Sequence, residues 1–109
     1  MTAHRAARYA ASLAATLALA SCTWVEPDAG GSTVEVARAA QDLGGCLRRG
    51  EVTVSVKADV AGIDRNPLKV RDELESLARN EAATLGATHV QSLEDPHDGE
   101  QRFAAYDCD

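Results

Sequence analysis

One long amphipathic segment, residues 66–86, constrains the fold of this chain more than any other feature. Asn66-Pro67 is a typical helix start, because asparagine can accept hydrogen bonds from free N–H groups and proline already has the backbone angle of a first helical position. Gly86 can end the helix in a left-handed conformation. The apolar side chains form a single stripe: Val70, Leu74, Leu77, Ala78, Ala82 and Leu85. The opposite side is polar: Lys69, Asp72, Glu73, Ser76, Asn80 and Thr84.

The rest of the domain is predicted to form a small sheet that this helix covers. Residues 50–57 alternate, with three valines on one face and Glu51, Thr53, Ser55 and Lys57 on the other, which indicates a strand with one covered and one wet face. Shorter strands are predicted at 33–37, with Val34 and Val36 inward, at 87–93 and at 102–108. Residues 38–43 are ambiguous and can form a helical turn, residues 58–65 are predicted as a loop, and 94–100 as a turn. The pattern predicts a two-layer α+β domain: one amphipathic helix on a mostly antiparallel sheet of about four strands, in the order strand-strand-helix-strand-strand.

Residues 1–21 are predicted to be a signal peptide that is removed. Met1 to Arg8 holds two arginines and no acid, and a twelve-residue run of mostly Ala, Leu, Ser and Thr follows, too short for a membrane-spanning helix of about 20 apolar residues. Leu19-Ala20-Ser21-Cys22 then resembles the lipobox of bacterial lipoproteins. The resemblance implies that the Cys22 thiol carries a diacylglyceryl group and that the new N-terminus is acylated. The alternative is an ordinary cleavage site that lies beside a cysteine.

The predicted organisation and location follow from this lipobox. Residues 22–32 contain turn-forming residues without apolar periodicity and are predicted to be the lipidated cysteine and a flexible tether, with the α+β domain at 33–109. Thr23, rather than Asp, follows the cysteine, which implies sorting to the outer membrane with the domain facing the periplasm. The membrane is thus an expected partner through the N-terminal lipid anchor.

Two cysteines remain once Cys22 is assigned to lipid. Exported proteins occupy an oxidising compartment, so a disulfide between Cys46 and Cys108 is expected, closing a ring of about 63 residues. Such a bond requires the two Cα atoms to lie within about 7 Å. The alternative is a pair of free thiols for redox or metal chemistry.

Charge and motifs exclude several classes of function. The chain has a net charge of −6, and loss of residues 1–21 leaves 9 basic and 17 acidic side chains, a net charge of −8 that opposes binding to nucleic acid or anionic lipid. The sequence contains no G-x-S-x-G, H-E-x-x-H or glycine-rich phosphate loop, so we predict neither an enzyme nor a cofactor, and no small-molecule ligand is identified.

His89 is interpreted as a half-buried or surface strand residue. The acids and histidine of the last turn can hold a divalent ion, but ordinary turn chemistry explains them and no metal site is predicted: Asp95, His97, Asp98 and Glu100.

Several motifs resemble one family. These are Gly45-Cys46 ahead of Gly50-Glu51-Val52, Asn66 before a helix with Ala78-Arg79-Asn80-Glu81-Ala82-Ala83, Leu85-Gly86-Ala87-Thr88-His89-Val90, and the terminal Tyr106-Asp107-Cys108. Over residues 33–109 they resemble small bacterial lipoproteins of the domain-of-unknown-function family four-one-five-six, which implies a fold and an address but no activity. The chain is more distantly similar to the outer-membrane stress-sensor lipoproteins of the Rcs phosphorelay, which have more disulfides and a longer tether.

Three hypotheses for the function follow. The first is a lipid-anchored binding or adaptor module of the cell envelope, contacting another envelope protein through the open face or edge of the sheet. The second is a stress or redox sensor in which the bond between Cys46 and Cys108 is the switch. The third is an envelope protein that binds divalent metal through the acids of the last turn.

Overall fold

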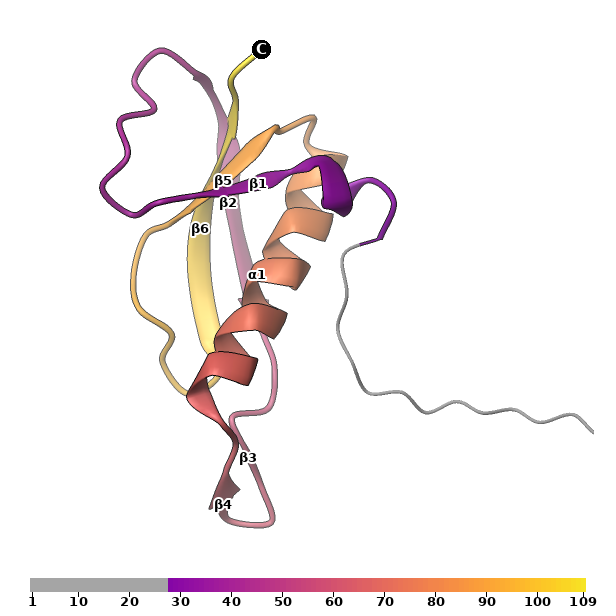
Figure 1. Cartoon of the computed structure of the whole chain (residues 1–109), viewed down its shortest axis with the longest axis vertical. Coiled ribbons are helices and arrows are strands. Elements are labelled where there is room, and N and C mark those ends of the chain that lie inside the picture. Colours follow the sequence, from indigo (N-terminus) through magenta and orange to yellow (C-terminus); the bar gives the residue numbers. More distant parts are fainter. Residues whose placement is uncertain (1–27) are drawn as a thin grey trace, which may run out of the picture.

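The computed structural model describes residues 28–109, so the predicted signal peptide and Cys22 lie outside the described residues. The elements are η1 (Gly31–Thr33), β1 (Glu35–Ala37), β2 (Leu47–Ser55), β3 (Asp59–Val60), β4 (Ile63–Asp64), α1 (Pro67–Thr84), β5 (His89–Ser92) and β6 (Glu100–Asp107). The main sheet has the order β1-β5-β6-β2; β6 is antiparallel to both of its neighbours, and β1 runs parallel to β5. The predicted two-layer α+β fold, one helix on a mostly antiparallel sheet, is confirmed (Figure 1).

The helix packs on the sheet through the predicted stripe. Val70, Leu74, Ala78 and Ala82 are buried and share one core cluster with the fully buried Phe103 of β6. At its start the Asn66 side chain accepts a hydrogen bond of 2.8 Å from the backbone N–H of Leu68, as predicted. At the other end the helix stops at Thr84 and Gly86 has φ +76°. The last member of the stripe, Leu85, therefore lies past the helix and is 39% exposed.

The valine strand ends earlier than predicted, so that Val56 follows β2 and is only partly buried, and the first strand does not bury both of its valines. Val52 and Val54 of β2 are buried, and Glu51 and Thr53 on the other face are exposed. Val34, just before β1, is also buried, but Val36 is 38% exposed. The reason is its place in the sheet: β1 is an edge strand, and Val36 lines an open cleft beside α1 rather than the core.

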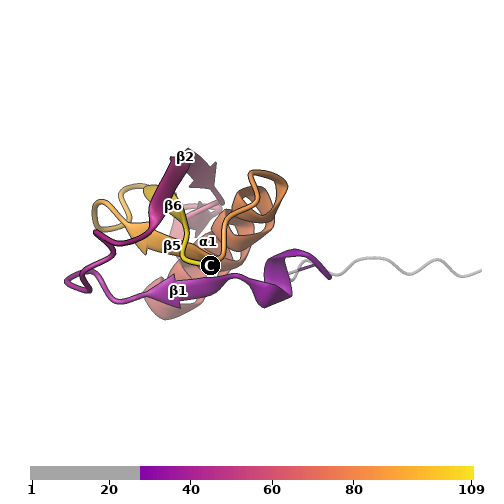
Figure 2. The same ribbon diagram turned by 90° about the horizontal axis from the view of Figure 1, so that it is seen from above.

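The connection from β1 to β2 covers part of the face that the helix leaves open. Because these strands form opposite edges of the sheet, residues 38–46 must cross it, and Figure 2 shows them on the side away from α1. Ala104 of β6 faces away from the helix and is nevertheless buried. Leu43 of the crossing segment is buried as well. The Gln91 side chain donates hydrogen bonds to the carbonyls of Arg38 (2.9 Å) and Gln41 (2.8 Å). The face predicted to be wet is therefore partly covered.

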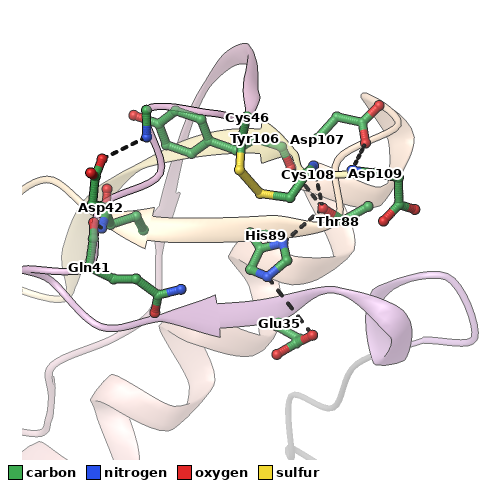
Figure 3. Close-up of a disulfide and its surroundings, with 12 residues drawn as sticks. Glu35, Gln41, Asp42, Cys46, Thr88, His89, Tyr106, Asp107, Cys108 and Asp109 are labelled. Carbon is green, nitrogen blue, oxygen red and sulfur yellow. Dashed lines mark hydrogen bonds and ion pairs between the residues drawn. A yellow bond between two sulfur atoms is a disulfide. The ribbon is translucent and has the colours of Figure 1, made fainter.

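The disulfide between Cys46 and Cys108 links the end of this crossing segment to the residue that follows β6. Cys46 directly precedes β2 and Cys108 directly follows β6, and these strands are antiparallel neighbours with Leu47 opposite Asp107. The Cα atoms lie 4.3 Å apart, within the limit set from the sequence, and the predicted bond is confirmed (Figure 3).

Candidate functional site

The segment between β2 and the helix, predicted as a loop, is a β-hairpin in the structure. Asp59 pairs with Asp64 and Val60 with Ile63, so that β3 and β4 form a small separate sheet. Its turn is Ala61-Gly62, with φ of 53° and 80°, the pair of positive angles that suits a two-residue hairpin. The prediction failed because alanine seldom takes such an angle, so the sequence lacks the Asn-Gly or Asp-Gly signal.

An ion pair fixes the base of the hairpin to the helix. The guanidinium of Arg65, the residue after β4, contacts both carboxylate oxygens of Glu73, at 2.7 and 3.0 Å, and donates a hydrogen bond of 2.9 Å to the carbonyl of Lys57. Glu73 was predicted on the polar side of the helix, but it is only 9% exposed. Pairing with Arg65 explains its burial, because a carboxylate can leave water when a guanidinium satisfies both of its oxygens.

The pair predicts a pH dependence of stability. The hydrogen bonds from Arg65 hold the pKa of Glu73 below its usual value of 4.5, so the pair stabilises the fold above that pH and the stabilisation is lost as the pH falls. Glu73→Gln is therefore expected to lower the free energy of unfolding at pH 7 by about 2 kcal/mol. Urea unfolding at pH 7 and at pH 3 measures this difference. If the difference in unfolding free energy between the unaltered protein and the variant were as large at pH 3 as at pH 7, the predicted pH dependence would be wrong.

The hairpin carries apolar side chains that the domain leaves uncovered. Val60 is 57% exposed and Ile63 is 73% exposed, and Leu68 in the first turn of the helix is 70% exposed. We call Asp59, Val60, Ile63, Asp64 and Leu68 the hairpin end. In Figure 1 the hairpin projects past the helix, away from the main sheet and the C-terminus. Single exposed apolar residues are ordinary, but here three apolar side chains that are more than half exposed belong to one end of the domain, which makes this end a candidate contact surface.

A groove lies beside the hairpin. It has a volume of about 460 Å³ and is lined by residues 56–61 and by Asp98. Asp98 stands in the tight turn before β6, and the backbone N–H of Val56 donates a hydrogen bond of 2.8 Å to the carbonyl of Gly99 in that turn. Gly99 permits this approach, because a Cβ there would overlap the carbonyl oxygen of Val56.

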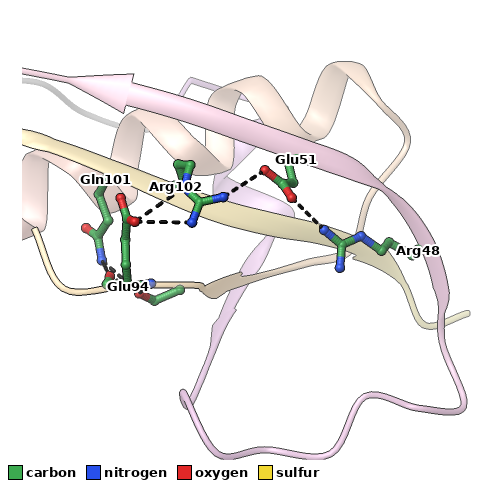
Figure 4. Close-up of polar contacts among 6 residues, drawn as sticks. Arg48, Glu51, Glu94, Gln101 and Arg102 are labelled. Carbon is green, nitrogen blue, oxygen red and sulfur yellow. Dashed lines mark hydrogen bonds and ion pairs between the residues drawn. The ribbon is translucent and has the colours of Figure 1, made fainter.

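Charges at the hairpin end are unpaired, unlike those on the open face of the sheet. On that face Arg102 pairs with Glu51 (3.4 Å) and Glu94 (3.2 Å), and Glu51 pairs with Arg48 (3.1 Å), as Figure 4 shows. By contrast, within residues 28–109 no side chain forms a hydrogen bond or ion pair with Asp59 or Asp64, although these two carboxylates stand on directly opposite residues. The charges of the open face are largely compensated, whereas those of the hairpin are not.

The last turn does not gather the ligand set considered from the sequence. His97 and Asp98 approach to 3.4 Å, but both side chains are almost fully exposed. His97 and Glu100 are joined only through backbone hydrogen bonds of 2.9 Å. In the part of the chain that the structure describes, no group of three or more His, Cys, Asp or Glu side chains is placed to hold a metal ion.

The surroundings of the disulfide form a hydrogen-bonded corner. The backbone N–H of Cys108 donates to the Thr88 hydroxyl at 2.8 Å, and this hydroxyl also contacts Nδ1 of His89 at 2.8 Å. His89 is half-buried in β5, as interpreted from the sequence, with Glu35 at 3.9 Å (Figure 3). The pKa of Asp107 is lowered by the backbone N–H of Asp109 and by Arg49. Cys46 and Cys108 are both partly exposed.

One buried amide was not singled out in the sequence. Gln101 is 3% exposed, and its amide nitrogen donates to the Ser92 hydroxyl and the Glu94 carbonyl, both at 2.9 Å. Its amide oxygen has no hydrogen-bond donor among residues 28–109. Gln101 lines the same cleft as Val36, and its side chain ties the end of β5 to the start of β6.

Comparison with known proteins gives one match. The model of the family described as Domain of unknown function (DUF4156) matches residues 25–108. Neither the curated proteins nor the solved structures contain a significant match, so the more distant similarity to the Rcs lipoproteins stays a prediction. Among residues 28–109 no helix has the length and apolar character needed to cross a bilayer.

Proposed function

This chain belongs to the family described as Domain of unknown function (DUF4156), and from that premise we propose that it is a lipid-anchored binding module of the bacterial cell envelope. In this proposal Cys22 carries the lipid, the anchor lies in the outer membrane, and the domain contacts an envelope protein. The contact is made by the hairpin end. The description of the family names no activity, so the proposal stands on the residues of this chain.

The observation that carries the proposal is the exposure of Val60 and Ile63 on a hairpin that is held in place. A mobile loop can fold its apolar side chains onto the domain, but here the Arg65–Glu73 pair fixes the hairpin base, and a backbone hydrogen bond of 2.8 Å from Arg65 to Ala58 closes it. Apolar side chains presented on a fixed element favour a contact with another protein.

The position of the tether suits such a contact. The backbone N–H of Asp28 donates a hydrogen bond of 2.7 Å to the Asn80 side chain, in the second half of the helix. The hairpin directly precedes Pro67, so about 20 Å of helix, at 1.5 Å per residue, separates it from Asn80. The lipid anchor would thus join the domain near one end of the helix while the hairpin end projects at the other.

Lipidation accounts for membrane attachment without any apolar protein surface. One acyl chain binds a bilayer only marginally, whereas two or three hold a small domain essentially permanently. The apolar residues of the hairpin are therefore not needed for attachment and remain available to a protein partner.

Photocrosslinking in cells tests the proposal. A photoreactive phenylalanine analogue in place of Ile63 is expected to form an adduct with one envelope protein, because its side chain lies within the proposed contact. The matched control places the analogue at Thr53, which is exposed on β2, and is expected to form no such adduct. The adduct is measured by immunoblot and identified by mass spectrometry.

The lipid anchor is tested in the same cells. Cys22→Ser is expected to move the protein from the membrane fraction to the soluble fraction, while the unaltered protein has the added mass of its acyl groups. Equal adducts from positions 53 and 63 would contradict the role of the hairpin end. An unaltered protein without acyl mass would contradict the anchor.

A further inference from the structure

We infer that the hairpin end binds a basic, partly apolar segment of its partner protein, with a lysine or arginine side chain in the groove between β3 and the Asp98 turn. The inference rests on the proposed binding function and adds the chemistry of the partner. Three features of the hairpin end and its surroundings support it: exposed apolar side chains, unpaired carboxylates around them, and a groove lined by consecutive residues of the chain.

The charges decide which partner fits. Asp59 and Asp64 face one another across the hairpin, an arrangement that destabilises a strand pair, and Asp98 stands across the groove. Of the two cationic residues that flank the hairpin in the chain, Lys57 lines the groove without an ion pair to either aspartate, and Arg65 is already engaged by Glu73. A basic side chain from a partner would relieve the repulsion between Asp59 and Asp64.

The shape of the groove suits a segment rather than a single small ion. The groove is lined by six consecutive residues, 56–61, so a bound chain would lie along the backbone of β3. In its two-stranded sheet β3 pairs with β4 on one side only, which leaves the backbone groups of its other edge for an incoming chain. Alternate side chains of an extended segment would then meet Val60 and the carboxylates.

Other occupants fit these observations less well. An anionic bilayer would be repelled by the aspartates of the hairpin end. A second copy of the chain without residues 1–21 would bring the same aspartates and a net charge of −8 to the contact. A basic protein segment satisfies both the apolar and the acidic parts of the surface. The test below therefore includes the bilayer and the second copy as outcomes.

Peptide binding to the full chain, purified from cells in a non-ionic detergent, tests the inference. The probe is a capped hexapeptide of alternating lysine and valine, and the comparison peptide has glutamate in place of lysine. In ¹⁵N-labelled protein, the lysine peptide is expected to shift the amide signals of residues 56–64 and of Asp98 and Gly99, whereas the glutamate peptide is expected to leave them unchanged. This assay uses neither the lipid nor the partner, so its outcome is independent of the crosslinking and fractionation results.

Matched variants sharpen the result. Asp59→Asn with Asp64→Asn is expected to raise the Kd of the lysine peptide about tenfold, because two surface charge pairs are lost. Glu35→Gln with Glu81→Gln removes the same charge from exposed positions elsewhere and is expected to leave the Kd unchanged. Both double variants should be fully folded at the temperature of the titration, as measured by circular dichroism, so that a change in Kd is not caused by unfolding.

Four results would overturn the inference. They are an equal effect of the glutamate peptide, shifts that map to the open face of the sheet, line broadening of the hairpin signals by phosphatidylglycerol vesicles, and hairpin signals that move with protein concentration alone. The third result would assign the hairpin end to a membrane, and the fourth to a second copy of the chain.

Discussion

Replacing Cys46 and Cys108 together by alanine is expected to lower the free energy of unfolding by about 4 kcal/mol. The bond joins residues 62 positions apart, and in the chain-entropy model a loop of that size removes roughly this much freedom from the unfolded chain. Domains of this size have only about 5–15 kcal/mol of stability in all, so the variant is expected to be partly unfolded at 37 °C. Urea unfolding followed by circular dichroism, at pH 7 and without reductant, measures the difference.

The structure also predicts where the reduced protein opens first. Residues 38–46 cross the open face of the sheet, where Leu43 is buried and Gln91 donates to two of the backbone carbonyls. The disulfide holds the far end of this segment, so its loss is expected to raise amide hydrogen exchange at residues 43–47 more than in α1. Reduction of the unaltered protein should reproduce the variant. A loss below 1 kcal/mol would mean that Leu43 and Gln91 hold the segment without the bond.

The elements whose signals are local could be predicted from the sequence. The helix is specified by Asn66-Pro67, by the apolar stripe and by Gly86, all within one stretch of chain. In the structure the helix begins at Pro67 and ends at Thr84, two residues before Gly86. The alternation around Val52 and Val54 likewise places the covered face of β2. Cys46 and Cys108 could be paired because few alternatives remained after Cys22 was assigned to lipid.

The features that were missed depend on contacts between distant segments. The helical pattern places Glu73 at the same position whether its side chain is paired or free. Its burial is explained only by the ion pair with Arg65, which follows the hairpin. The exposure of Val36 follows from the place of β1 at the sheet edge, which the sequence does not reveal.

The candidate site was missed for a related reason. Val60 and Ile63 are residues that a sequence pattern assigns to a core, and the segment around them was predicted as a loop because Ala61 gave no turn signal. A surface is recognised as uncovered only once the packing of the whole domain is known. The sequence therefore favoured the open face or edge of the sheet as a contact surface and did not indicate the exposed hairpin end.

Gly99→Ala is expected to lower the free energy of unfolding by about 3 kcal/mol and to displace the hairpin. Gly99 has φ +75°, which costs an alanine about 1–2 kcal/mol, and its new Cβ would overlap the carbonyl oxygen of Val56, which adds about 1–3 kcal/mol of overpacking. The matched control is Gly62→Ala: Gly62 has φ +80° but has nothing within 4 Å of the added atom. The control therefore measures the cost of the backbone angle alone.

The difference between the two variants isolates the close approach that positions the groove. Because only Lys57 and Ala58 separate Val56 from β3, relief of the overlap at Gly99 is expected to move the hairpin. Gly99→Ala should therefore weaken binding of the lysine–valine peptide even at temperatures where the protein is fully folded. Gly62→Ala changes the turn at the tip and leaves the contact between Val56 and Gly99 in place. Equal stabilities of the two variants in urea would show that the backbone at Val56 moves without a cost in free energy, and the groove would then be flexible rather than fixed.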